Sequence, residues 1–256
     1  MIEVENISKT FKLSKKQKKE LNTKDEFSHA VKNVSFTCQP GRVFSLLGPN
    51  GAGKTTTLRM ISTIFKPTDG SIKVCGLDTQ KDELAIRKKI GFLTGSTGLY
   101  QRLTPNEILN YFGKLYKLSD TEINQRKSEL YSLLDMESFQ NKRLGKLSTG
   151  MKQKVSIART MIHDPEVVIF DEPTSGLDVI TSENIIQLIK SCKDQGKTVI
   201  FSSHIMSEVD LLCDDMAIID QGEILFSGTM DQFRSEMKEK TLTGEFIRIV
   251  NEKRAQ

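Results

Sequence analysis

The chain has 256 residues and a formal net charge of +4, from 37 Lys and Arg residues against 33 Asp and Glu residues. Its 37% hydrophobic and 27% charged residues are typical of an ordinary folded protein, which excludes disordered and fibrous classes. No apolar run is as long as a membrane-spanning helix, which needs about 18 residues or more. The N-terminus lacks the pattern of a secretory signal, so we expect a cytoplasmic protein.

Short apolar runs rich in Val, Ile and Phe recur along the chain and predict β-strands. The predicted strands cover residues 31–38, 43–47, 167–170, 198–201 and 216–219. Helical patterns separate most of them, and strands that alternate with helices favour an α/β domain with a largely parallel sheet. In such a sheet, ligands bind at the carboxyl ends of the strands.

The strand pattern stops between about residues 96 and 164. Residues 103–118 and 121–134 are predicted to be amphipathic helices, the second with Asp120 as its N-cap. We therefore expect a helical subdomain, inserted into the α/β core over this region.

The last part of the chain has a helical pattern without strands. Residues 231–239 and 244–253 are predicted to form two terminal helices on a polar surface. These patterns divide the chain into a main domain at 1–228 and a helical extension at 229–256.

A glycine-rich loop follows the predicted strand 43–47 and precedes a helical pattern. It matches the phosphate-loop pattern G-x-x-x-x-G-K-[ST], in which backbone N–H groups at a helix N-terminus surround phosphate oxygens. We expect Lys54 to bridge the β- and γ-phosphates and the Thr55 hydroxyl to ligate Mg²⁺. A glycine-rich turn with an exposed lysine is the alternative, and the correct flanks disfavour it. The candidate nucleotide-binding residues are Gly48, Pro49, Asn50, Gly51, Ala52, Gly53, Lys54, Thr55 and Thr56.

Two adjacent acids end the predicted strand 167–170. Because side chains alternate along a strand, Asp171 and Glu172 can take different roles. We expect Asp171 to hold the Mg²⁺ shell through water, and Glu172 to polarise a water near the γ-phosphate. Alone, such a pair is equally compatible with a helix N-cap. The phosphate loop upstream favours a catalytic site.

A histidine follows another predicted strand, at 198–201. His204 should therefore lie at the same sheet edge as the phosphate loop and Asp171, where a neutral imidazole can bond a γ-phosphate or orient water. His29 and His163 are interpreted as structural. The four cysteines are widely spaced without a CxxC pair, which favours reduced thiols over disulfides or zinc.

A second candidate anion site lies at the end of the helical insertion. Leu147-Ser148-Thr149-Gly150 opens a helical pattern over 151–161, and small residues at a helix N-terminus suit an anion. Two copies packed head to tail can use both anion sites on one nucleotide.

Together these motifs resemble the nucleotide-binding subunits of ABC transporters over nearly the whole chain. The matching motifs are Walker A at 48–55, the signature at 147–151, the end of Walker B at 171–172, the D-loop at 175–178 and the switch histidine at 204. The resemblance implies a P-loop NTPase fold of the ABC ATPase type: a mostly parallel sheet core with an antiparallel β subdomain and an inserted α-helical subdomain.

The resemblance also implies a homodimer with ATP and Mg²⁺. Two chains would sandwich two ATP molecules, with Ser148, Thr149 and Gly150 of one chain facing the ATP of the other, and with Asp178 in the D-loop. Phe11 would stack on adenine, and its alternative is an edge-strand core residue.

Two positions depart from the family pattern. The signature reads Thr149-Gly150-Met151 where the family usually has Gly-Gly-Gln, so a side-chain amide is lost. Gly95 replaces the family's glutamine that reaches Mg²⁺ and the attacking water, and Gln101 is too far displaced to inherit that role.

Segments 92–100 and 147–154 resemble the NatA-type ATPase subunits of bacterial sodium exporters. Segment 241–246 resembles the ending of exporter ATPases whose membrane partner is a separate ABC-2-type chain. We expect the ATP-hydrolysing subunit of an exporter, peripheral at the cytoplasmic face of the membrane, that powers efflux of sodium. The alternatives are a drug or polysaccharide exporter of the ABC-2 type, an importer ATPase and a soluble non-transport ABC ATPase.

A basic segment at about 12–27 is predicted to be a loop inserted between two strands, since it lacks apolar periodicity. It accounts for most of the net charge and leaves the rest of the chain nearly neutral, so we expect no nucleic-acid partner. A solvated insertion is the favoured interpretation, and contact with anionic lipid is the alternative. The lysines that would make this contact are Lys15, Lys16, Lys18 and Lys19.

Overall fold

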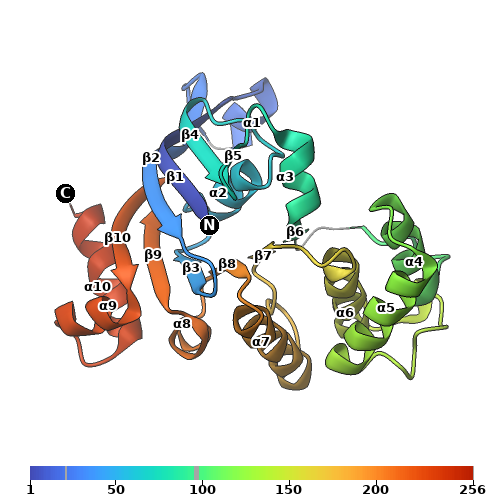
Figure 1. Ribbon diagram of the computed structural model, residues 1–256. Helices are drawn as coiled ribbons and strands as arrows, with labels where there is room; N and C mark the ends of the chain where they lie inside the picture. Colours follow the sequence, from blue (N-terminus) through green and yellow to red (C-terminus); the bar gives the residue numbers. More distant parts are fainter. Residues whose placement is uncertain (21, 95–97, 256) are drawn as a thin grey trace.

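The computed structural model describes residues 1–20, 22–94 and 98–255, which form two sheets and the helices around them (Figure 1). The larger sheet has the strand order β10-β9-β3-β8-β7-β6. Its strands are β3 (Val43–Leu47), β6 (Ile90–Leu93), β7 (Val167–Asp171), β8 (Thr198–Ser203), β9 (Asp215–Asp220) and β10 (Glu223–Thr229). All neighbours are parallel except β10, which pairs antiparallel with β9. The predicted α/β fold with a mostly parallel sheet is confirmed.

Strand β7 shows why the central strands read as continuous apolar runs. All five of its residues are buried, because both faces of the sheet are covered. Val168 and Phe170 belong to the hydrophobic core on one face, and Val167 and Ile169 belong to the core on the other. The functional loops at the strand ends thus rest on a sheet that is packed on both sides.

The smaller sheet is antiparallel, with the order β2-β1-β4-β5. Its strands are β1 (Ile2–Lys12), β2 (Phe27–Cys38), β4 (Asp69–Val74) and β5 (Leu77–Asp78). The predicted antiparallel subdomain is therefore present. Strand β2 begins earlier than the predicted strand at 31–38. Its first four residues, 27–30, are exposed or partly exposed and lack a continuous apolar run, while Val34, Phe36 and Cys38 alternate into the core.

Helices cover both faces of the larger sheet (Figure 1). Helix α2 (Lys54–Ile61) packs on β4 and β7 between the two sheets, and α3 (Glu83–Lys89) packs on β5 and β6. Helices α7 (Val179–Asp194) and α8 (Met206–Leu212) cover the opposite face.

The inserted helices lie together at one end of the molecule (Figure 1). They are α4 (Pro105–Leu115), α5 (Asp120–Leu134) and α6 (Thr149–Met161), with a short 3₁₀ turn at Leu144–Lys146. The prediction of Asp120 as an N-cap is wrong. Ser119 takes that position, because its hydroxyl accepts the Glu122 N–H while the Glu122 carboxylate accepts the Ser119 N–H.

The basic segment was predicted to be a loop, and this prediction is only partly right. The segment contains helix α1 (Lys15–Glu20) between β1 and β2. Ser14 and Gln17 exchange hydrogen bonds between side chain and backbone at the start of this helix. Such local capping stabilises a turn of helix without an apolar face, which is why hydrophobic periodicity did not reveal it.

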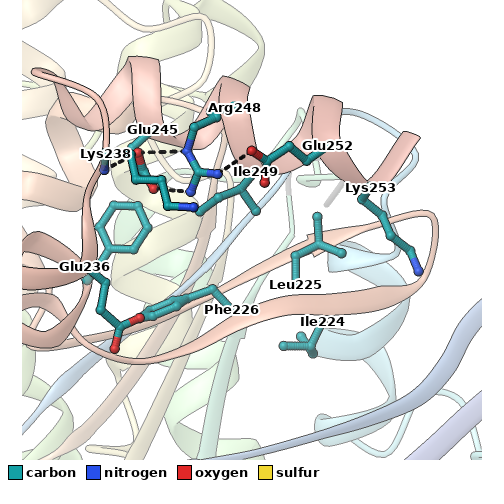
Figure 2. A pocket seen from close by; sticks show the side chains of 11 residues that line it. Ile224, Leu225, Phe226, Glu236, Lys238, Glu245, Arg248, Ile249, Glu252 and Lys253 are labelled. Atoms are coloured by element: carbon teal, nitrogen blue, oxygen red, sulfur yellow. Dashed lines mark hydrogen bonds and ion pairs between the residues drawn. The ribbon is translucent and has the colours of Figure 1, made fainter. Parts of the chain in front are cut away.

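Helices α9 (Met230–Glu236) and α10 (Leu242–Arg254) pack beside β10 at the other end of the sheet (Figure 1). They are not simply surface helices, since Met230, Phe233 and Val250 are buried in the main core. A cavity of about 470 Å³ lies between β10 and α10 (Figure 2). Above it, Glu245, Arg248 and Glu252 form a chain of ion pairs along α10.

The carboxylate of Glu245 makes this packing sensitive to acid. Hydrogen bonds from Arg248 and from the Lys238 and Glu239 N–H groups lower the pKa of Glu245 from 4.5 to about 2. Because the pKa is depressed in the folded state, this stabilisation is complete above about pH 4.5 and is lost as the pH falls toward 2.

We expect Glu245→Gln to lower the free energy of unfolding by about 1.5–3 kcal/mol at pH 7, and by much less at pH 3. Urea denaturation at the two pH values measures this, with the exposed Glu236→Gln as the matched control. An equal loss at both pH values would contradict the assignment.

In the described part of the chain, no helix combines the length and hydropathy needed to cross a bilayer. All four cysteines are free thiols, as predicted, and burial raises the pKa of Cys192 to about 12.

Candidate active site

Three loops meet at the carboxyl edge of the larger sheet. The glycine-rich loop follows β3, Asp171 and Glu172 end β7, and His204 follows β8. Strand β8 lies between β3 and β7, and the Gly48 N–H contacts the Ser203 carbonyl at 3.4 Å. The sheet therefore brings together the residues whose convergence the sequence predicted.

Glycine is required at two positions of the loop by close backbone contacts. A Cβ at Gly48 would lie 2.2 Å from the Ile219 carbonyl oxygen. Gly53 has φ +108° and a Cβ there would lie 2.6 Å from the Ala30 carbonyl oxygen, so only glycine fits. Gly53 also begins α2 without a side-chain cap, which leaves the first N–H groups of the helix available to an anion.

A cavity of about 200 Å³ lies over this helix N-terminus. It is lined by Ala30, Asn50, Gly51, Ala52, Gly53, Lys54, Thr55, Thr56 and Glu172. Lys54 is only 5% exposed, and its ammonium donates to the Gly48 and Pro49 carbonyls at 2.6 and 3.1 Å. The backbone thus curls around the ammonium group, which places a positive charge at the wall of the cavity.

Oxygen ligands lie beside the cavity. The Asp171 Oδ1 atom accepts hydrogen bonds from Thr55 Oγ1 at 3.0 Å and from Ser202 Oγ at 2.7 Å. Mg²⁺ prefers such oxygen donors and is commonly held by one carboxylate together with phosphate oxygens and water. Within the ranges that the structure describes, no group of three or more His, Cys, Asp or Glu side chains is arranged to hold a metal ion.

Glu172 is held between two nitrogen donors. Its Oε1 atom lies 3.3 Å from Lys54 Nζ and 3.3 Å from His204 Nδ1. Its backbone is left-handed, with φ +49°, and its N–H donates to Ser202 Oγ. A carboxylate that lines the cavity in this way has the reach of a general base toward a water beside a bound phosphate.

Two supporting residues were missed in the sequence. Ser202 bonds both Asp171 and the Glu172 backbone. Glu208 on α8 accepts from Thr174 Oγ1 at 2.5 Å and from Ser203 Oγ at 2.9 Å, and so ties the loop after β7 to the end of β8. Ser202 could have been found from its pairing with Asp171 across β7 and β8, but that pairing is known only once the strand register is known.

The signature and D-loop residues lie together, away from the phosphate cavity of the same chain. Ser148 caps α6, its Oγ accepting the Met151 N–H at 3.2 Å. Asp178 caps α7 by accepting from the Thr181 N–H and hydroxyl, which lowers the pKa of that carboxylate. A Cβ at Gly150 would lie 3.4 Å from Asp178 Oδ2, so the two helix N-termini abut. None of these residues, nor Thr149, lines the phosphate cavity.

Phe11 is placed on β1, where its ring packs edge-on against Phe65 with the centroids 5.5 Å apart. It does not line the phosphate cavity, and its contact with adenine stays a prediction. Gly95 lies outside the described residues. The Gln101 side chain donates to the Leu99 carbonyl at 3.0 Å, within its own loop.

His163 has the structural role that its sequence context predicted. Its ring stacks on Tyr116 with the centroids 3.7 Å apart, and its Nε2 atom lies 3.1 Å from the Ile90 carbonyl oxygen. Burial lowers its pKa to about 4, so the ring is neutral at physiological pH. His29 lies 3.1 Å from the Thr10 hydroxyl on the smaller sheet.

Comparison with known proteins supports the nucleotide-binding site described above. The family described as ABC transporter matches residues 31–175. The chain is 46% identical over 212 residues to the ABC transporter ATP-binding protein NatA of Bacillus subtilis (strain 168), covering 82% of this chain and 86% of that protein. It is 37% identical to the linearmycin resistance ATP-binding protein LnrL of the same strain, covering 87% of this chain and 71% of that one.

Solved structures agree with the sequence matches. An ATP-binding subunit of an ABC transporter superposes with a TM-score of 0.84 at 26% identity, covering 98% of this chain and 99% of that chain. A dimeric ATP-binding cassette, in a post-hydrolysis state with bound ADP and phosphate, superposes with a TM-score of 0.78 at 30% identity and covers 90% and 99%. The chain therefore belongs to the ABC transporter family, as an ATPase coupled to transport.

Proposed function

We propose that this chain powers an exporter that moves sodium ions through a separate ABC-2-type membrane subunit. The observation that carries the proposal is the resemblance of segments 92–100 and 147–154 to the NatA-type ATPase subunits, together with 46% identity to NatA over most of both chains. Such a membrane subunit would hold the chain at the cytoplasmic face of the membrane.

The test is reconstitution of this chain with the membrane protein encoded beside it. Inverted vesicles that contain both chains should take up sodium when ATP is added, and vesicles with the Glu172→Gln variant should not. ATP hydrolysis without sodium movement would contradict the sodium assignment. The similarity to LnrL supports drug export as the second candidate, which drug resistance without sodium transport in the same cells would favour.

The nucleotide chemistry is assigned to the residues around the cavity. Lys54 and the N–H groups of α2 bind phosphate oxygens, while Thr55 and Asp171 supply oxygen ligands for Mg²⁺. Mg²⁺ would neutralise charge on the phosphate oxygens. Glu172 takes a proton from the attacking water, and His204 holds the Glu172 carboxylate in place.

We propose a homodimer because the signature residues do not line the phosphate cavity of their own chain. Beside them, Val179 and Ile180 at the start of α7 are 85% and 75% exposed, an apolar surface next to Asp178. Packing of a second copy head to tail would bury these side chains and bring Ser148, Thr149 and Gly150 to the partner's ATP. The dimeric cassettes among the solved relatives support this arrangement.

The basic segment is the second proposed contact of the chain, with anionic lipid near the membrane subunit. Lys15 and Lys19 at opposite ends of α1 are exposed, and each lysine near such a surface contributes about 1 kcal/mol of binding free energy. We expect deletion of residues 13–26 to weaken binding to vesicles that contain phosphatidylserine at low salt, with no change for neutral vesicles. Salt-insensitive binding, or binding that the deletion leaves unchanged, would leave the segment a solvated insertion.

A further inference from the structure

The turn between β9 and β10 contacts the phosphate loop. Gln221 and Gly222 both have positive φ, +48° and +83°, as in the tight turns that join antiparallel strands. The Gly222 N–H donates to the Ala52 carbonyl at 2.9 Å, and the Ile219 carbonyl occupies the space beside Gly48. The position of the phosphate loop therefore depends on the position of this turn.

Helix α10 holds the same turn from the other side. The Arg254 guanidinium donates from Nε to Asp220 Oδ2 at 2.8 Å and from Nη2 to Asp220 Oδ1 at 3.0 Å. Lys253 pairs with Glu223 at 3.0 Å. Asp220 and Glu223 flank the turn directly, so two consecutive residues of α10 bind its two ends. In Figure 2, Lys253 lies apart from the ion pairs that Arg248 makes with Glu245 and Glu252.

Burial of Asp220 makes the position of the β9–β10 turn depend on its ion pair with Arg254. The Asp220 side chain is only 2% exposed, whereas Arg254 is about half-exposed at the surface. A buried carboxylate that loses its cationic partner is strongly destabilised and must move toward water or another donor. Such a movement would shift the two-residue turn, and with it the backbone that contacts Ala52 and Gly48.

We propose that Arg254 is a positioning residue for ATP binding, which acts through Asp220 and the β9–β10 turn on the phosphate loop. The inference rests on the proposed phosphate site at Lys54. It assigns to α10 a role that the family resemblance does not give it, since this helix lies outside the matched residues 31–175. Through this contact path, any partner that displaces α10 would lower the affinity for ATP.

The test compares Arg254→Ala with wild type in the full chain, by the KM and kcat of ATP hydrolysis and by calorimetric titration of ATP. We expect KM and Kd to rise about three- to tenfold, while kcat at saturating ATP stays within about twofold, because the catalytic groups are untouched. Arg254→Lys retains the charge and should give an intermediate KM. Glu252→Gln, on the same turn of α10 but paired with Arg248, is the matched control and should leave KM unchanged.

A second variant guards against a general loss of folding. Asp220→Asn should raise KM in the same way, and the double variant Arg254→Ala with Asp220→Asn should be no worse than the more severe single one. An unchanged KM in folded Arg254→Ala, or an equal rise in Glu252→Gln, would overturn the inference. If Lys54→Ala leaves ATP binding intact, the proposed phosphate site fails instead, which separates the two failures.

Discussion

Glu172→Gln will reduce the rate of ATP hydrolysis by about 10²–10⁴-fold and leave ATP bound. Glutamine has nearly the same shape as glutamate, so the contact to His204 can persist, but its amide cannot accept a proton from water. The carboxylate that is removed lies 3.3 Å from both Lys54 Nζ and His204 Nδ1 and lines the phosphate cavity. Phosphate release measures turnover, and calorimetry measures the retained ATP affinity.

The same variant tests the proposed dimer. Because ATP is retained but not hydrolysed, two copies should stay associated around it, and size-exclusion chromatography with ATP should show a dimer that wild type does not accumulate. Glu183→Gln, an exposed position on α7, is the matched control and should behave as wild type. Equal hydrolysis by Glu172→Gln and wild type would remove Glu172 from the catalytic role.

Residues within short contiguous motifs were predictable from the sequence. Gly53, Lys54 and Asp171 are linked by backbone geometry to a strand end or a helix start, so an apolar run next to a motif fixes where each lies. Parallel strands place their carboxyl ends at one edge of the sheet, and this rule predicted that His204 lies beside the phosphate loop and Asp171.

Residues whose roles depend on register or on distant packing were not predictable. Ser202 serves the site only because β8 pairs with β7 so that it lies beside Asp171. The Arg254–Asp220 pair joins positions 34 residues apart, and neither residue belongs to a recognisable pattern. Strand β1 was implied only as an edge strand before the basic segment and its bounds were not predicted. Charged and polar residues occupy its outward face, and an irregularity in the register between Val4 and Ile7 interrupts the alternation that Ile2 and Val4 begin.

Lys54→Ala will weaken ATP binding by about 10²–10³-fold, the effect of leaving a buried charge without its partner. Loss of the Lys54 ammonium has two consequences, and both weaken ATP binding. The phosphate loses the ammonium at the wall of the cavity, and Glu172 loses the cation 3.3 Å away, so its negative charge faces the γ-phosphate directly. The variant should therefore bind ADP better than ATP, relative to wild type.

Calorimetry with ATP and with ADP measures both effects. Lys66→Ala is the matched control, since Lys66 pairs with Glu83 at the surface and is 68% exposed against 5% for Lys54. Lys54→Met keeps the aliphatic stem and removes only the charge, so a loss equal to that of alanine assigns the effect to electrostatics. An unchanged ATP affinity in both Lys54 variants would mean that the helix N-terminus alone binds the phosphates. The Lys54 ammonium would then serve only to hold the loop backbone in shape.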